Sequence, residues 1–142
     1  MVMADRDVVM AKVATIDRCL ARIAEIQVAG QRPPLDVEDI TVLNLQRAVQ
    51  ATVDLAGHLV SDWQLGLPSS LKENFRLLEH RGLGQNLSAK LQAMVGFRNI
   101  AVHDYQTIDV AILRSIVDHD LDDLRAFCRF AMAALGRTPS AT

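Results

Sequence analysis

The residues best suited to chemistry lie in one short segment, Arg98–Tyr105, with the sequence RNIAVHDY. It brings together a guanidinium (Arg98), an amide (Asn99), an imidazole (His103) and a phenol (Tyr105). A histidine near its unperturbed pKa of about 6.5 can accept or donate a proton close to neutral pH. An arginine offers a forked pair of donors to phosphate oxygens and stabilises the charge that develops on them. The segment is therefore suited to phosphoryl transfer.

This chemistry needs no metal when the substrate carries its own nucleophile, as RNA does in its 2′-hydroxyl group. The reaction would be attack of that hydroxyl on the neighbouring phosphorus. We therefore expect no metal site and no cofactor. The sequence also contains no Walker loop, no GxGxxG before a strand, no GxSxG and no HExxH, which removes the commoner enzyme classes.

The surroundings of Arg98 leave two interpretations open. At about 100° per residue, one apolar stripe runs along this helix with Arg98 in its middle, made by Leu91, Met94, Val95, Ala101 and Val102. A guanidinium cannot be deprotonated and is rarely buried without a partner. Arg98 must therefore meet a carboxylate, for which Asp54 is a candidate, or face a place where a phosphate arrives.

The spacing of Arg98 and His103 predicts a homodimer. They are five residues apart, so on an unbroken helix they point about 140° away from each other. One chain can bring them together only if the helix ends or distorts near His103. A two-fold dimer removes the difficulty, because the same residues of both chains can line a shared cleft.

Apolar residues recur at intervals of three and four throughout, which predicts an all-α fold, an up-and-down bundle of about five helices. We expect one helical domain over residues 1–135, followed by a loose tail over 136–142. The expected helices cover about 4–28, 37–61, 69–80, 87–103 and 107–135. Glycines and prolines separate them.

Composition limits the function classes. The net charge of −2 argues against a general nucleic-acid coat protein. Residues 72–98 hold five basic and two acidic side chains, so a polyanion should be drawn to the middle of the chain. The cysteines, Cys19 and Cys128, form no CxxC pair and are typical of reduced thiols in a cytoplasmic protein. No run of eighteen apolar residues is present, which predicts no membrane span.

Other polar groups are weaker candidates. Asp54 and His58 are four residues apart on one helix and could clamp a metal, but no third ligand is nearby in the sequence. Asp54 is better interpreted as an orienting carboxylate for Arg98 or as a helix-surface pair. The acidic run over residues 118–123 is typical of a solvated face, and a docking patch for a basic partner is the alternative.

The full string resembles a known family. Phe97-Arg98-Asn99, followed by Val102-His103-Asp104-Tyr105, is similar to the signature of HepT-like toxins in the HEPN superfamily, R-x4-H-x-Y with a polar residue after the arginine. The segments Leu45–Gln50 and Glu73–Leu78 resemble the second and third helices of that family. The resemblance spans about residues 8–130.

The resemblance implies a homodimeric, metal-independent endoribonuclease that acts as the toxin of a toxin–antitoxin pair. His103 would be the general acid/base and Arg98 would stabilise the scissile phosphate, while Asn99 would orient the phosphate or the histidine. The usual partner is MntA, a minimal nucleotidyltransferase, which transfers AMP from ATP onto the tyrosine, here Tyr105. The alternative is a non-catalytic helical module that binds a nucleotidyltransferase.

Overall fold

The computed structural model describes residues 5–103 and 108–135, and in these ranges every regular element is a helix. The α-helices are α1 (Arg6–Ile26), α2 (Pro34–Asp62), α3 (Glu73–Leu78), α4 (Gln85–His103), α5 (Val110–His119) and α6 (Leu121–Leu135), and a 3₁₀ turn, η1 (Glu79–Arg81), follows α3. The predicted all-α class is thus confirmed.

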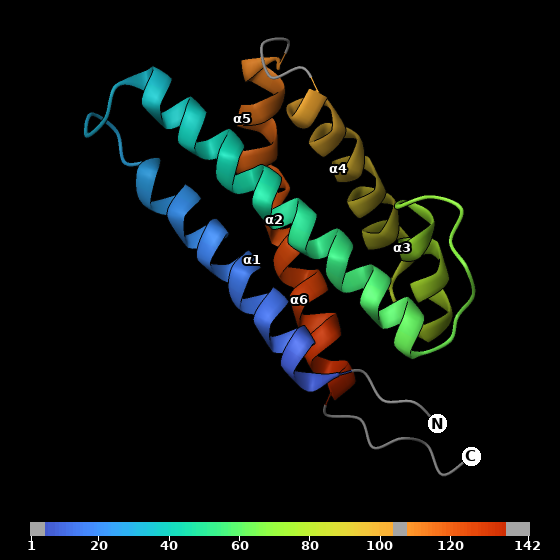
Figure 1. The fold of residues 1–142 in the computed structure, drawn as a ribbon. Helices are drawn as coiled ribbons and strands as arrows, with labels where there is room; N and C mark the ends of the chain where they lie inside the picture. The colour runs from blue at the N-terminus through green and yellow to red at the C-terminus, as the bar shows by residue number, and fades with distance from the viewer. Residues whose placement is uncertain (1–4, 104–107, 136–142) are drawn as a thin grey trace.

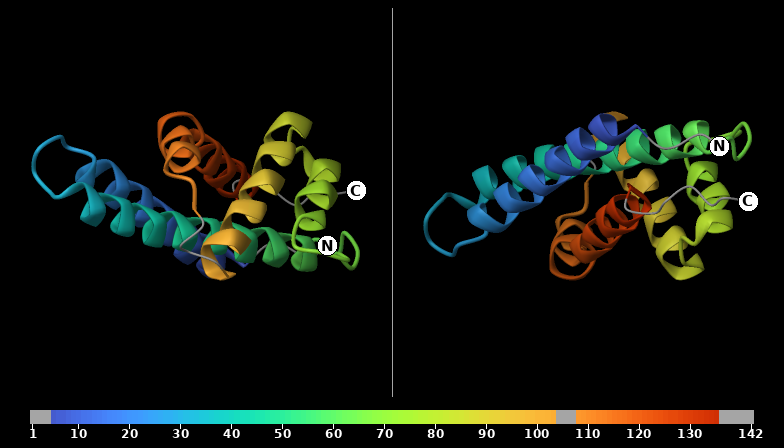
Figure 2. Two further views of the ribbon diagram at one scale, coloured as in Figure 1. Left: turned by 90° about the horizontal axis from the view of Figure 1, so that it is seen from above. Right: turned by 90° about the horizontal axis from the view of Figure 1, so that it is seen from below.

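A long antiparallel hairpin of α1 and α2 forms one layer of the molecule (Figure 1). The two helices pack against each other more extensively than any other pair. Both views in Figure 2 place α6 on one side of this hairpin, with α3 and the beginning of α4 beside it. α4 then crosses α2, so that its C-terminal end lies on the side of the hairpin that faces away from α6.

The expected helix ends are shifted by local chemistry. α1 begins after Asp5, whose carboxylate accepts from the backbone N–H groups of Asp7 and Val8 at 2.9 and 3.3 Å. α2 begins at Pro34, three residues earlier than predicted, because proline suits the first turn of a helix. α3 begins at Glu73, later than the expected start at 69. Before it, the Ser70 hydroxyl accepts from the backbone N–H of Glu73 at 3.2 Å, and the Glu73 carboxylate accepts from the backbone N–H of Ser69 at 2.9 Å.

The prediction of about five helices was wrong at the last one, since the stretch 107–135 contains two helices. α5 closes where the backbone N–H of Asp120 donates to Ile116 O at 2.8 Å, and α6 opens where that of Asp123 donates to Asp120 O at 3.1 Å. Asp120 itself has φ −109° and ψ −10°. Aspartate favours helix ends over interiors because its side chain competes for backbone hydrogen bonds. The break turns α6 along α1.

The core lies between the hairpin and the remaining helices. Leu45, Leu55 and Leu59 of α2 are fully buried with Leu124 and Phe127 of α6. Aromatic rings then extend the core in a chain: Phe75–Phe127 with centroids 5.6 Å apart, Phe127–Phe130 at 5.9 Å and Trp63–Phe130 at 6.3 Å. α4 packs against α2, α3 and α6 of this core, and these contacts set its position.

No helix in the described ranges is both long and apolar enough to cross a membrane.

Candidate active site

The first half of α4 is held in place by a ladder of polar contacts. Ser88 is fully buried, and its hydroxyl donates to Glu79 Oε2 at 2.8 Å. The Gln92 amide donates to the same hydroxyl at 3.1 Å and accepts from Arg76 Nε at 3.3 Å. These bonds fix α4 to α3 and to η1, and they position the residues that follow on α4.

The apolar stripe predicted along α4 is present where the structure describes it. Leu91, Met94 and Val95 are buried. The side chains of Ala101 and Val102 lie outside the described part of the structure. The stripe therefore anchors α4 up to one turn before Arg98.

Arg98 is half-buried at the edge of this anchored region. Its Nη1 donates to the Asn99 side-chain oxygen at 2.9 Å. Its Nε is buried and has no hydrogen-bond partner among the described residues. A buried donor without an acceptor costs roughly 1–3 kcal/mol. The guanidinium thus retains donor capacity, and its observed partner is a neutral amide.

The bonds that the structure gives to Asp54 go to residues other than Arg98 and His58. Its carboxylate accepts from Lys12 Nζ of α1 at 3.3 Å and from the Gln50 amide at 2.8 Å. His58, the other half of the suggested metal clamp, instead contacts Asp62, with Nε2 and Oδ2 2.9 Å apart. Within the described ranges, no group of three or more His, Cys, Asp or Glu side chains could hold a metal ion.

His103 and Tyr105 fall at the limit of the described structure. His103 is the last residue of α4, and its side chain lies outside the described part, as does the whole of Tyr105. α4 is a single helix over Gln85–His103, so it does not break between Arg98 and His103, and its described part ends at His103.

An apolar cavity of about 470 Å³ borders the same stretch of α4 and was not foreseen from the sequence. Phe97 and Ile100 of α4 line it together with Ile112 and Ile116 of α5. Ile100 is 51% exposed and Ile112 is 56% exposed. The sequence does contain a sign of this cavity, because the apolar Ile112 lies off the face of α5 that is buried at Leu113 and Ile116.

Asp123 lines this cavity together with a second acidic residue, Asp120. The Oδ1 atom of Asp123 lies 3.7 Å from Lys90 Nζ, while its Oδ2 is buried without a partner. Burial raises the pKa of Asp123, the positive charge of Lys90 partly opposes this, and the nearby Asp120 and Asp122 raise it further. In its buried position the ionised carboxylate of Asp123 therefore lacks a hydrogen-bond donor at Oδ2 among the described residues.

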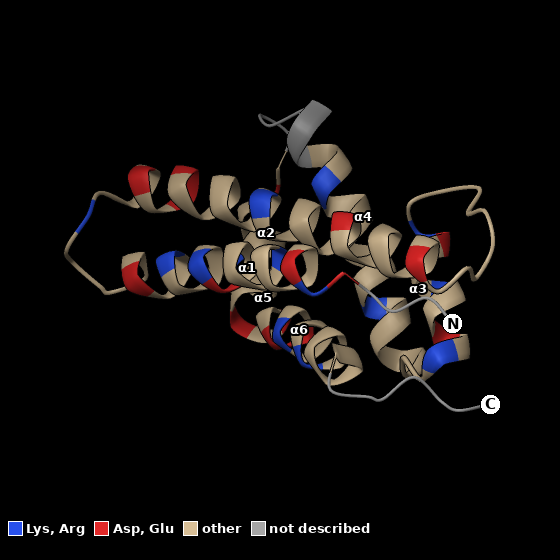
Figure 3. Cartoon of the chain, turned by 60° about the horizontal axis from the view of Figure 1, so that its bottom comes forward, with Lys and Arg blue, Asp and Glu red and all other residues tan. Residues whose placement is uncertain are grey.

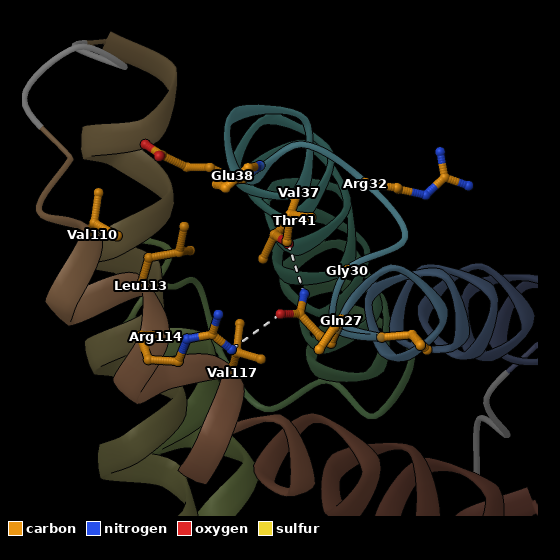
Figure 4. Close-up of a pocket in the computed structure, with 13 residues that line it drawn as sticks. Gln27, Gly30, Arg32, Val37, Glu38, Thr41, Val110, Leu113, Arg114 and Val117 are labelled. Atoms are coloured by element: carbon orange, nitrogen blue, oxygen red, sulfur yellow. Dashed lines mark hydrogen bonds between the residues drawn. The ribbon is translucent and has the colours of Figure 1, made fainter.

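A second cavity, of about 360 Å³, lies between the α1–α2 turn and α5 (Figure 4). Gln27 crosses it, accepting from Arg114 Nη1 at 3.1 Å and donating to the Thr41 hydroxyl at 2.9 Å. These bonds tie α5 to both helices of the hairpin. None of the predicted site residues lines this cavity.

The acidic run over residues 118–123 is mostly solvated surface. Asp122 pairs with Arg125 at 2.7 Å, and Asp118 lies 3.8 Å from Arg114, with the acids 86% and 48% exposed. Exposed pairs of this kind contribute little to stability. They give no sign of a docking patch.

Comparison with known proteins shows the family of this chain. A family model described as ribonuclease HepT-like matches residues 16–131. The mRNA nuclease HepT of Shewanella oneidensis is 42% identical over 124 residues, which is 85% of this chain and 93% of that protein.

Two solved structures share the fold. One is a crystal structure of a toxin–antitoxin with AMP-PNP, with a TM-score of 0.84 and 38% identity, covering 90% of this chain and 99% of that chain. The other is the tri-AMPylated Shewanella oneidensis HEPN toxin in complex with MNT antitoxin, with a TM-score of 0.83 and 39% identity, covering 91% and 99%. Because the family model covers most of the chain and the identity is high over nearly all of a relative, this chain belongs to the ribonuclease HepT-like family.

Proposed function

We propose that this chain is the toxin of a toxin–antitoxin pair, an endoribonuclease that a cognate nucleotidyltransferase neutralises by attaching AMP to Tyr105. The observation that carries the proposal is Arg98, which is half-buried and bonded to the neutral Asn99 amide, with Nε unpartnered. A structural arginine at such a place would be paired with an acid. Among the described residues this guanidinium has no acid partner and so keeps donors for an anion.

His103 and Arg98 divide the chemistry between them. His103 takes the proton from the 2′-hydroxyl, whose oxygen attacks the adjacent phosphorus. The bond from phosphorus to the 5′-oxygen breaks, and the imidazolium returns the proton to that oxygen. The products are a 2′,3′-cyclic phosphate and a free 5′-hydroxyl. Arg98 stabilises the charge on the phosphoryl oxygens, and Asn99 holds the guanidinium in the orientation seen here.

The active unit is a homodimer. α4 is unbroken over Gln85–His103, so Arg98 and His103 of one chain diverge by about 140° around its axis. A second copy supplies the missing partner for each side chain. The apolar cavity beside Arg98, with Ile100 and Ile112 more than half exposed, offers a surface that the second copy covers.

AMP on Tyr105 blocks the site directly. The phenol lies seven residues after Arg98 in the sequence, a separation that on a continuous helix corresponds to about two turns on the same face. The attached phosphate would reach the guanidinium, occupy the place of the RNA phosphate and repel the incoming backbone. The Shewanella oneidensis HEPN toxin is tri-AMPylated in its complex with MNT antitoxin, which supports this route. We place the pair in the cytoplasm, where RNA and ATP are available.

One experiment tests the nuclease. Purified wild type and His103→Ala are incubated with total RNA in the presence of EDTA, and the ends of the products are analysed. We expect wild type to cleave and leave 2′,3′-cyclic phosphates, and His103→Ala to leave the RNA intact. His80→Ala, which changes an exposed histidine of η1, is the matched control and should cleave as wild type does. Equal and negligible cleavage by wild type and His103→Ala would refute the proposal and favour a non-catalytic binding module.

A second experiment tests the neutralisation. The chain is co-expressed with the nucleotidyltransferase encoded beside it, and its intact mass is measured. Wild type should gain one or more AMP units, and Tyr105→Phe should gain none. A wild-type protein without added mass, or an equal gain in Tyr105→Phe, would contradict modification of this residue.

A further inference from the structure

A groove of about 800 Å³ runs along the outer face of the hairpin, between α1 and α2. Only these two helices line it, and its walls carry the four basic side chains Lys12, Arg18, Arg22 and Arg47. We call it the α1–α2 groove. Figure 3 shows Lys and Arg positions along both α1 and α2.

The groove is basic although the protein is acidic. Its lining contains four basic side chains and a single acidic one, Asp54, whereas the whole chain has a net charge of −2. Lys12 pairs with Asp54 at 3.3 Å and Arg22 with Glu25 at 2.9 Å, but all four side chains are at least 37% exposed. Pairs this open are weak and exchange readily with other anions.

Arg18 of α1 and Arg47 of α2 both act on Cys19, which is 5% exposed and lines the groove with them. Burial raises the pKa of the Cys19 thiol, while the positive charges of Arg18 and Arg47 both act to lower it. The two guanidinium groups therefore contribute positive potential at the same lining residue.

The uncharged lining also suits a nucleic-acid strand. Asn44, Gln46 and Gln50 carry amides, and Thr15 a hydroxyl, all with oxygens able to accept. The Thr15 hydroxyl already donates to Ala11 O, while each amide nitrogen carries two hydrogens and donates one at most to Ile40 O or Asp54. Side chains of these types, together with arginine and lysine, make most contacts to phosphates and sugars. From Lys12 to Arg22 the groove follows α1 for about 15 Å, which is long enough for several phosphates of one strand.

The groove lies on the same side of the molecule as the end of α4. Figure 2 places the C-terminal end of α4 on the side of the hairpin away from α6, and Figures 1 and 3 show α2 lying between α1 and α4. A strand bound at Arg98 can therefore continue across α2 into the groove. RNA, which is already the substrate of the proposed reaction, is favoured over an acidic protein as the ligand of this groove. Its sugars and bases can form hydrogen bonds with the amide side chains of the lining, in addition to the contacts between phosphates and basic side chains.

We infer that the α1–α2 groove is a second binding site for the RNA backbone, separate from residues 98–105, through which the protein holds longer RNA. This inference rests on the proposed nuclease function. The groove takes no part in bond cleavage. It therefore lowers the KM for long RNA and leaves kcat unchanged.

The test compares two double variants that remove the same charge. Arg18→Gln/Arg47→Gln alters the groove, and Arg125→Gln/Arg129→Gln alters two arginines of α6 on the other side of the hairpin. Affinity for a fluorescent 20-nucleotide RNA is measured in the His103→Ala background, at several salt concentrations. Cleavage of the same RNA and of a dinucleoside monophosphate is measured with His103 intact. Circular dichroism checks that each variant folds.

The groove variant should bind the long RNA on the order of tenfold more weakly. The slope of log affinity against log salt should shrink by about 1.4, as expected for two lost phosphate contacts on a single strand. Its KM for long RNA should rise on the order of tenfold, with kcat unchanged. Cleavage of the dinucleoside monophosphate, which is too short to reach the groove, should stay at the wild-type level. The α6 variant should match wild type throughout.

Three results would overturn the inference. The first is wild-type affinity of the groove variant for the long RNA. The second is an equal loss on the dinucleoside monophosphate, which would place the effect in the active site. The third is unchanged RNA binding with lost binding of the antitoxin, which would make the groove a protein interface. If wild type cleaves neither substrate, the nuclease proposal fails by itself, and the affinity comparison still decides on the groove.

Discussion

Replacing Arg98 with alanine should abolish most RNA cleavage without destabilising the fold. Loss of one preorganised donor to a developing charge costs about 2.7–4 kcal/mol of transition-state stabilisation, a rate reduction of about 100- to 1,000-fold. The stability change follows from the contacts. Nε is buried without an acceptor, so its removal relieves a penalty of roughly 1–3 kcal/mol. The methylenes of the half-buried side chain lose packing of comparable size, at about 0.8 kcal/mol each.

The two effects on stability oppose each other, so the free energy of unfolding should stay within about 1 kcal/mol of wild type. An arginine that closed a buried ion pair would behave differently, because breaking such a pair costs about 3–5 kcal/mol. Urea denaturation followed by circular dichroism measures the stability, and cleavage of a fluorescent RNA measures the rate. Arg76→Ala is the control, since it removes an exposed arginine that also bonds to α4, through Gln92 at 3.3 Å.

Either of two results would refute this reasoning. One is cleavage by Arg98→Ala within about threefold of wild type, which would mean that the guanidinium does not act in the transition state. The other is a destabilisation of 3 kcal/mol or more, about the cost of a broken buried ion pair, with activity lost in parallel. That outcome would make Arg98 a structural residue.

Three further predictions concern the scaffold. Phe127→Ala should lower the free energy of unfolding by about 3–5 kcal/mol, because it empties a fully buried site between two other rings. Urea denaturation measures this change, and a loss below about 1 kcal/mol would contradict the packing. Ile100→Asp/Ile112→Asp should convert the dimer to a monomer in analytical ultracentrifugation and abolish cleavage, and a monomeric but active wild type would refute the shared cleft. Asp123→Asn should raise the melting temperature at neutral pH. The pKa of Asp123 is raised above its ordinary value of 3.8 by folding, so the native state loses stability as the pH rises through this range. The advantage of the variant should shrink as the solution is acidified, and a constant advantage would show that ionisation is not its cause.

The sequence predicted the helical fold well because its signals are local. Apolar residues spaced by three and four define which face of each helix is buried, and glycines and prolines define where helices end. The last helix was the exception. Its apolar periodicity runs through Asp120 almost undisturbed, and the hydrogen bonds that close α5 at Ile116 and open α6 are needed to reveal the break.

The basic groove shows why charge counted along the chain misleads. Residues 1–66 are acidic in total, and the sequence therefore pointed to residues 72–98 as the region for a polyanion. The tertiary structure brings Lys12, Arg18, Arg22 and Arg47 to one face of the hairpin, with Asp54 as the single acid in the lining. Helical period and the pairing of α1 with α2 decide this segregation, and neither is visible in a net charge.

By itself, the sequence determined the class of fold and the residue types that can do the chemistry, since helix periodicity and the string from Arg98 to Tyr105 are properties of the chain. Only the tertiary structure decided which partners those residues have. Asp54, a suitable ion-pair partner for Arg98 by residue type, is bonded to Lys12 and Gln50 instead. The physical reason is that hydrogen bonds depend on distances of a few ångströms between helices, which packing of the whole core sets.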